Sequence, residues 1–153
     1  MSKESTMEQM IHKFEMVMNK YNAREKAPRY YGTKDLLYRA EVHTIEAIGK
    51  NNKINVTDLA QYLGITKGAV SQMIDKLIKK DMVSKKQVSE TENEVSLELT
   101  ENGRLAYEGH EKYHKELYSH ISKCLSSSSD ENLETFMEIL TLLDNFFDEK
   151  GQS

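Results

Sequence analysis

The sequence has little cysteine and little proline, and it has no long apolar run. Its single cysteine, Cys124, cannot form a disulfide within the chain, which favours a reducing compartment, and we expect a packed thiol there. The only proline, Pro28, lies in a connector between two helical patterns. No window approaches the roughly 18 consecutive apolar residues that a membrane-spanning helix needs, and residues 1–5 lead into no apolar segment typical of a secretory signal. We therefore expect a cytoplasmic protein without a membrane partner.

Charge is unevenly distributed along the 153 residues, a length that suits one domain. The chain carries 21 basic and 25 acidic residues, a net charge of −4, which argues against indiscriminate coating of nucleic acid. Residues 66–86, however, hold six lysines against two aspartates, whereas residues 124–153 hold one lysine against seven acidic residues. This contrast indicates one surface that meets a polyanion and another that does not.

The periodicity of apolar residues predicts a mainly α fold with one small β-hairpin. Spacings of three and four predict six helices, with their apolar positions within 7–21, 38–48, 59–63, 70–77, 106–121 and 133–147. Residues 82–88 and 95–99 read as two strands joined by a turn at 89–94. Caps are expected at Thr57, Thr66 and Thr100 for the third, fourth and fifth helices, and Ser128 with Glu131 forms a capping box for the last.

Residues 56–73 carry the offsets of a helix-turn-helix. Ala60 supplies the small residue where two short helices cross, and Gly64, four residues later, tolerates the positive φ of a tight turn. Five apolar residues close a small core: Leu59, Leu63, Ile65, Val70 and Met73. The opposite face of the second helix carries a polar stripe able to reach bases and phosphates in a major groove: Ser71, Gln72, Asp75, Lys76 and Lys79. The alternative is a plain helical hairpin with a solvated lysine face.

After the predicted hairpin, Leu99, Thr100 and Gly103 follow the pattern LTxxG. With this pattern and the helix-turn-helix, the chain resembles, over almost its whole length, the MarR family of winged-helix regulators. The resemblance implies a single domain of residues 1–153, with a winged helix-turn-helix DNA-binding lobe at 33–99 and dimerisation helices at 5–25 and 101–149. It implies a homodimeric transcriptional regulator, expected to be a repressor, that binds a pseudo-palindromic double-stranded DNA operator. The residues expected to face DNA at the start and along the recognition helix are Thr66, Lys67, Gly68, Ser71, Gln72 and Lys76.

The predicted wing departs from the family pattern. Family wings usually carry an Asp-x-Arg pair whose arginine enters the minor groove, whereas residues 89–94 hold three glutamates and no arginine. Because phosphates repel carboxylates, the minor-groove contact is not expected here, and Lys85 and Lys86 at the base of the wing are the expected backbone contacts. The acidic wing also leaves open an adaptor that keeps the fold but does not bind DNA.

The first and last helices give an independent reason to expect a homodimer. Each presents a long stripe of methionine, leucine and phenylalanine that a single chain of this layout would struggle to cover. Packing each stripe against a symmetry mate covers both. The alternative is a monomer whose terminal helices fold onto its own core.

Residues 110–114 match HExxH, the zinc metalloprotease pattern, and His120 falls where a metzincin has its third ligand. Metzincins need a glycine at the position of Leu117, where the chain leaves the helix. Because Leu117 lies on the apolar stripe, the helix is expected to continue. At about 100° per residue, His120 then points away from His114. We therefore expect no enzyme, and a zinc-dependent hydrolase using His110 and Glu111 is the alternative.

His110 and His114 are four residues apart, which places two imidazoles on one helix face within reach of one metal ion. The zinc-sensing branch of the MarR family, the adhesin-competence repressor type, takes its ligands from positions similar to Glu25, His43, His110 and His114. The resemblance implies a zinc site that links the dimerisation helices to the DNA-binding lobe, with zinc as co-repressor. The alternatives are ordinary histidines, or a small anionic or aromatic effector in a cavity lined by Tyr30, Tyr31 and Tyr38.

Overall fold

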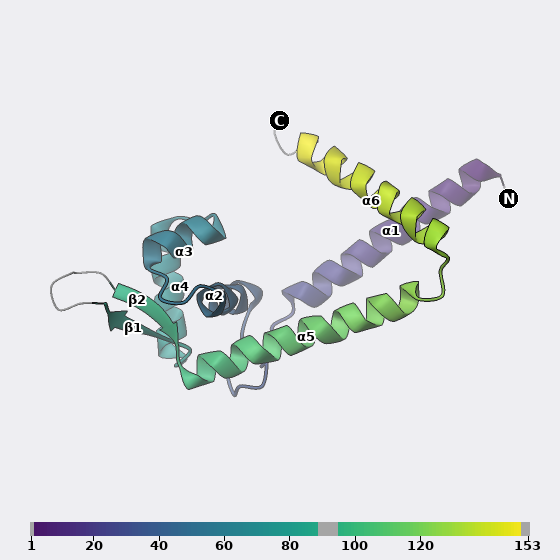
Figure 1. Ribbon diagram of the computed structural model, residues 1–153. Helices are drawn as coiled ribbons and strands as arrows, with labels where there is room; N and C mark the ends of the chain where they lie inside the picture. Colours follow the sequence, from purple (N-terminus) through teal and green to yellow (C-terminus); the bar gives the residue numbers. More distant parts are fainter. Residues whose placement is uncertain (1, 89–94, 151–153) are drawn as a thin grey trace. The chain divides into compact units, whose positions relative to one another are not determined.

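The computed structural model describes residues 2–88 and 95–150, and within them the chain forms six helices and one β-hairpin (Figure 1). In chain order the elements are α1 (Lys3–Lys26), α2 (Arg39–Lys50), α3 (Val56–Leu63), α4 (Lys67–Lys79), β1 (Val83–Gln87), β2 (Val95–Leu99), α5 (Glu101–Leu125) and α6 (Asp130–Lys150). The predicted mainly α fold with a small hairpin is confirmed. The chain divides into two compact units, Met1–Lys112 and Tyr113–Ser153.

The hydrophobic core of the first unit lies between α2, α3, α4 and the hairpin (Figure 1). Each of these elements contributes side chains with no exposed area: Ile45, Leu59, Ile74, Leu77 and Leu97. The two strands pair antiparallel, with Val83 opposite Leu99. The backbone N–H of Leu97 donates to the carbonyl of Ile54, at 2.8 Å, so β2 is also held to the loop that precedes α3. The hairpin and the helix-turn-helix therefore share one core.

The turn between α3 and α4 has the conformation that its sequence predicts. Gly64 adopts φ 66° and ψ 32°, in the left-handed region, and its N–H donates to the carbonyls of Ala60 and Gln61. Ala60 is buried where the two helices meet. Thr66 is the N-cap of α4, and its side chain accepts from the N–H of Ala69 at 3.2 Å. These local features fix the angle at which α4 leaves α3.

Two predicted caps are wrong by one or two residues. Asn55, not Thr57, is the N-cap of α3, because its side-chain oxygen accepts from the N–H of Asp58 at 2.8 Å, and α3 begins at Val56. At the start of α6, Ser129 rather than Ser128 accepts from a helix N–H, that of Asn132. The predicted capping box between Ser128 and Glu131 is therefore absent from the described start of α6.

The N-terminus of α5 packs directly on the backbone that follows α4. Thr100 caps α5 as predicted, accepting from the N–H of Gly103 at 3.0 Å, and its own hydroxyl donates to the carbonyl of Asp81. The N–H of Thr100 also donates to the carbonyl of Met82 at 3.1 Å. Gly103 lies so close that a Cβ there would be 1.9 Å from the same Met82 oxygen. The absence of a side chain at Gly103 is therefore what allows this contact.

Among the residues that the structure describes, the terminal helices carry most of the large exposed apolar side chains. Glu25 is the one buried residue of α1, whereas its apolar stripe is open to solvent, including Met7, Met10, Ile11, Phe14 and Val17. Along α6 the exposed apolar residues include Phe136, Met137, Leu140, Leu142 and Phe147. Cys124, which we expected to be packed, is exposed. Among the described residues, no helix combines the length and the apolar character needed to cross a membrane.

Candidate functional site

The helix α4 has one buried face and one polar face. Val70, Ile74 and Leu77 are buried in the core, and the five residues of the predicted polar stripe, which we call the α4 polar face, are all exposed: Ser71, Gln72, Asp75, Lys76 and Lys79. The residues at the start of the helix, Thr66, Lys67 and Gly68, are exposed as well. The α4 polar face thus presents one hydroxyl, one amide, one carboxylate and two ammonium groups, which supply donors and acceptors for base edges and cations for phosphates.

The two lysines of β1 are exposed and paired with acidic side chains. The Lys85 Nζ lies 3.6 Å from a carboxylate oxygen of Asp75 on α4, and the Lys86 Nζ lies 3.4 Å from Glu98 on β2. Exposed pairs of this kind contribute little to stability, so both ammonium groups can exchange partners for phosphates at small cost. The predicted acidic turn at 89–94 lies outside the described residues.

A partly buried ion pair that sequence reasoning missed joins the end of α4 to the start of α2. The Lys80 Nζ lies 2.8 Å from Glu41, whose side chain is 8% exposed, and donates to the carbonyl of Leu36 at 2.8 Å. Glu41 in turn accepts from the N–H of Tyr38 at 2.9 Å, which caps α2. Glu41 lies two residues before His43, so helix α2 carries both this ion pair with Lys80 and His43.

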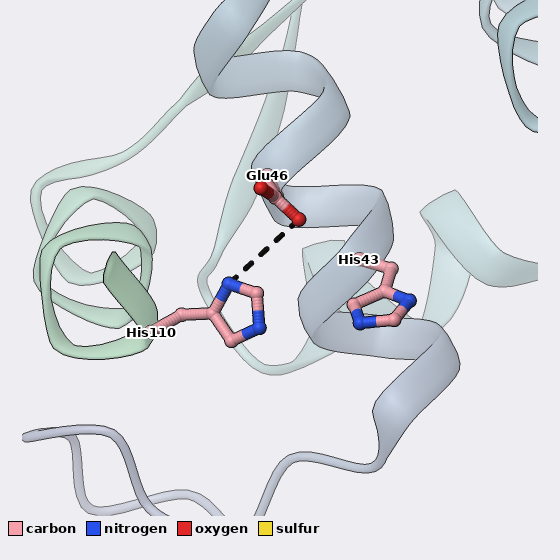
Figure 2. A group of neighbouring side chains, drawn as sticks. All are labelled: His43, Glu46 and His110. Carbon is pink, nitrogen blue, oxygen red and sulfur yellow. Dashed lines mark ion pairs between the residues drawn. The ribbon is translucent and has the colours of Figure 1, made fainter. Parts of the chain in front are cut away.

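A second polar cluster in the first unit consists of His43, Glu46 and His110 (Figure 2). One ligand atom from each residue lies within 4.8 Å of the other two. His43 and Glu46 are three residues apart on α2, so they share one helix face, and His110 reaches them from α5. His110 is 2% exposed, and its Nδ1 lies 3.8 Å from Glu46 Oε2. Its ring lies 5.4 Å from the ring of Tyr31, edge-on, and 5.5 Å from that of His43.

Glu46 is held as a carboxylate. Burial alone raises the pKa of Glu46, but a hydrogen bond from Lys50, together with the charge that His110 carries when it is protonated, outweighs that effect, so the pKa lies below its usual range. The Lys50 Nζ lies 2.5 Å from Oε1. One oxygen of Glu46 therefore faces an ammonium group and the other faces an imidazole nitrogen.

The structure brings two of the four predicted metal ligands together and adds one that we did not predict. His43 and His110 belong to the cluster, and Glu46 completes it in place of Glu25. Glu25 is buried near the end of α1, at 8% exposure. His114 is half-buried one turn after His110 along α5, and its ring contacts Tyr113 and Tyr118. The spacing of His43 and Glu46 on a predicted helix was the signal that could have found this carboxylate.

The tyrosines predicted to line an effector cavity have other contacts. Tyr31 packs against the core and against His110. The Lys80 ammonium lies 5.9 Å from the centre of the Tyr38 ring, and Tyr30 is exposed. Tyr31 therefore has a packing role in the first unit, whereas Tyr38, like Tyr30, is exposed.

The HExxH pattern lies within an unbroken helix. Helix α5 continues through Leu117 to Leu125, so the chain does not turn back after His114 as a metzincin requires. The Nδ1 of His120 lies 2.7 Å from the carbonyl of Glu116 on the same helix. The geometry therefore does not assemble the third ligand of a metalloprotease.

Residues 35–91 match the family model described as MarR family. The "HTH-type transcriptional regulator PchR" of Bacillus subtilis (strain 168) is 30% identical over 102 residues, which are 67% of this chain and 60% of that protein. The chain spans 49% to 60% of the length of the curated relatives that it matches. Both the family and these relatives are regulators rather than enzymes, in agreement with the prediction that the chain is not a hydrolase.

Solved structures of the same fold cover nearly the whole chain. FabT of Streptococcus pneumoniae, solved in complex with DNA, aligns with a TM-score of 0.65 at 24% identity, over 97% of this chain and 99% of that one. ZitR of Lactococcus lactis, described as a zinc-responsive MarR family member, aligns with a TM-score of 0.74 at 17% identity, over 92% and 99%. At these identities the likeness establishes the fold.

Proposed function

Because the chain belongs to the MarR family of helix-turn-helix regulators, we propose that it is a sequence-specific DNA-binding repressor that acts as a homodimer in the cytoplasm. The observation that carries this proposal is the exposed α4 polar face, which lies opposite a fully packed apolar face. In a helix-turn-helix the second helix enters the major groove, and its outward side chains contact the bases.

Charge supports the same assignment. Five of the six lysines between residues 66 and 86 are exposed, and the sixth, Lys80, is engaged with Glu41. The exposed lysines lie on α4 and on the neighbouring strand β1, so they border the α4 polar face on one side of the helix-turn-helix. We assign Lys67, Lys76 and Lys79 on α4, and Lys85 and Lys86 on β1, to phosphate contacts that set the position of the helix in the groove.

Fluorescence anisotropy with a duplex from the protein's own promoter tests this function. Since each phosphate that is neutralised releases counterions, we expect affinity to fall by roughly 10³-fold or more as salt rises from about 50 to about 200 mM. An unrelated duplex should bind more weakly at every salt concentration. Binding that is absent, or that does not respond to salt, would overturn the proposal and favour an adaptor with the same fold.

The homodimer is supported by the apolar faces of α1 and α6. Exposed apolar area on this scale is unusual for a chain that acts alone, because large apolar patches typically mark interaction surfaces. In a two-fold symmetric dimer, the apolar patch of one chain packs against the same patch of the second chain, so both patches are buried in one interface. The same axis places two α4 helices on one duplex, which fits an operator with two related half-sites.

We also propose that zinc is the effector, bound by Glu25, His43, His110 and His114. Imidazole nitrogen and carboxylate oxygen are ligands that zinc prefers. His43 and His110 already lie in one cluster, Glu25 is buried at the end of α1, and His114 follows His110 by one turn of α5. The zinc-responsive description of ZitR, a protein of the same fold, supports the choice of metal. Zinc bound there would favour one arrangement of the helices over others and so raise operator affinity.

Zinc titration of the metal-free protein, followed by operator binding, tests the effector. We expect zinc to tighten binding by roughly 5- to 150-fold, the usual range for coupled sites. His43→Ala and the double variant His110→Ala/His114→Ala should lose this response. His120→Ala is the matched control, because His120 is an exposed histidine of the same helix α5 and should respond like wild type. If zinc changes neither operator affinity nor thermal stability in the wild type, the zinc assignment is wrong, while DNA binding is unaffected.

A further inference from the structure

We propose that Glu46 is a positioning residue for the metal site: it holds His110 as the tautomer with a proton on Nδ1, so that Nε2 is the nitrogen that binds the metal. This inference rests on the proposed zinc site and adds a residue to it. It starts from the 3.8 Å approach of Glu46 Oε2 to His110 Nδ1, drawn as a dashed line in Figure 2.

The Glu46 carboxylate determines which nitrogen of His110 carries the proton. A carboxylate has only acceptor lone pairs, and in a neutral imidazole one nitrogen is a donor and the other an acceptor. If Nδ1 carried the lone pair, the buried nitrogen of His110 and the partly exposed carboxylate of Glu46, both electron-rich, would face each other across 3.8 Å. A proton on Nδ1 turns that repulsion into attraction, which strengthens in a low-dielectric environment. The carboxylate therefore selects the Nδ1–H form.

Neighbouring side chains hold the ring of His110 and the carboxylate of Glu46 in this orientation. His110 is 2% exposed and lies edge-on to Tyr31, with His43 on another side, so its ring has little room to flip. The other oxygen of Glu46 has a separate partner, because the Lys50 Nζ lies 2.5 Å from Oε1 while Oε2 faces His110. The two oxygens of the Glu46 carboxylate thus face two different partners, Lys50 and His110, and both contacts can exist at the same time.

A proton on Nδ1 leaves Nε2 of His110 as the nitrogen that can bind a metal. A metal-binding histidine almost always donates its second ring N–H to a carboxylate, a carbonyl or water, and this contact orients the ring and makes the ligating nitrogen more basic. In Figure 2 the second nitrogen of His110 lies on the side of the ring that faces His43. Glu46 therefore acts through His110 and does not need to touch the metal.

The first measurement uses the metal-free protein at about pH 8, where a histidine of ordinary pKa is neutral. A long-range 1H–15N NMR spectrum identifies the tautomer of each histidine. We expect His110 of the wild type to be the Nδ1–H form, and Glu46→Met to move it toward the Nε2–H form. Glu111→Met is the matched control, because Glu111 follows His110 directly but has Tyr107 as its partner, and its spectrum should match the wild type. An Nε2–H form in the wild type, or no change in Glu46→Met, would overturn the inference.

The second measurement is zinc affinity, by competition with a chromophoric chelator. Loss of the orienting carboxylate should weaken binding by roughly 10- to 100-fold in Glu46→Met and leave Glu111→Met unchanged. The cobalt(II) absorption bands should keep their position and intensity, because the ligands are the same. Bands that change as they would on loss of a ligand would show that Glu46 binds the metal itself and would overturn the positioning role. If the wild type binds no zinc, the zinc proposal and the role of Glu46 toward a metal both fail, and the tautomer measurement decides separately whether Glu46 selects the tautomer of His110.

Discussion

Replacing Gln72 by alanine is expected to weaken operator binding by roughly 30-fold to more than 10⁴-fold. Gln72 is exposed in the middle of the α4 polar face, and glutamine pairs with adenine through two hydrogen bonds in the major groove. Such a pair contributes about 1–3 kcal/mol of discrimination, and a dimer makes it twice, which gives about 2–6 kcal/mol in total. The measurement is anisotropy on the promoter duplex at fixed salt, with wild type and variant side by side.

Two controls separate base reading from other effects of Gln72→Ala. Gln61→Ala carries the same substitution at an exposed glutamine of α3, outside the α4 polar face, and should bind like wild type. Lys76→Ala should weaken binding about equally on all duplexes and reduce the salt slope by about two per dimer, because phosphate contacts carry no sequence information. If Gln72→Ala weakens promoter and unrelated duplexes by the same factor, Gln72 does not read a base.

The parts of the fold that the sequence predicts correctly are those that neighbouring residues determine. The tight turn needs a positive φ at one position, and Gly64 supplies it within a few residues of Ala60 and Thr66. Residues 95–99 form a strand as predicted, but their burial does not alternate, because Ser96 and Leu97 are both buried and Val95 is exposed. The errors are local as well: Asn55 caps α3 in place of Thr57, two residues further along, and both side chains can accept a helix N–H.

The contacts that sequence reasoning missed join residues far apart in the chain. Lys80 and Glu41 are 39 residues apart, and nothing in their local sequence indicates that the end of α4 meets the start of α2. The resemblance to a family supplied His43 and His110, but Glu46 depends on how this chain packs α5 against α2. A charged residue on a predicted helix face is usually solvated. The spacing of Glu46 from His43 therefore indicates a shared site only when His110 is known to lie beside both residues.

Gly103→Ala is expected to destabilise the protein by about 3 kcal/mol or more. A Cβ at residue 103 would lie 1.9 Å from the Met82 carbonyl oxygen and 2.9 Å from its carbon, so the start of α5 must move away. Backbone cannot rotate aside as a side chain can, and the movement also strains the hydrogen bonds that Thr100 makes with Met82 and Asp81. For a chain of this length the thermal midpoint should fall by roughly 6–12 °C, measured by circular dichroism at fixed protein concentration.

Gly68→Ala is the control for Gly103→Ala because it makes the same substitution in a helix without the contact. At Gly68 the nearest atom to an added Cβ is the Thr66 hydroxyl at 4.0 Å, and the residue is exposed near the start of α4. Alanine is favoured over glycine within a helix by up to about 1 kcal/mol, so this variant should be as stable as the wild type or slightly more stable. Gly103→Ala should therefore lower the midpoint, whereas Gly68→Ala should leave it unchanged or raise it slightly. Equal midpoints for Gly103→Ala and wild type would mean that α5 does not rest on the Met82 carbonyl, and that Thr100 alone fixes where the helix leaves the hairpin.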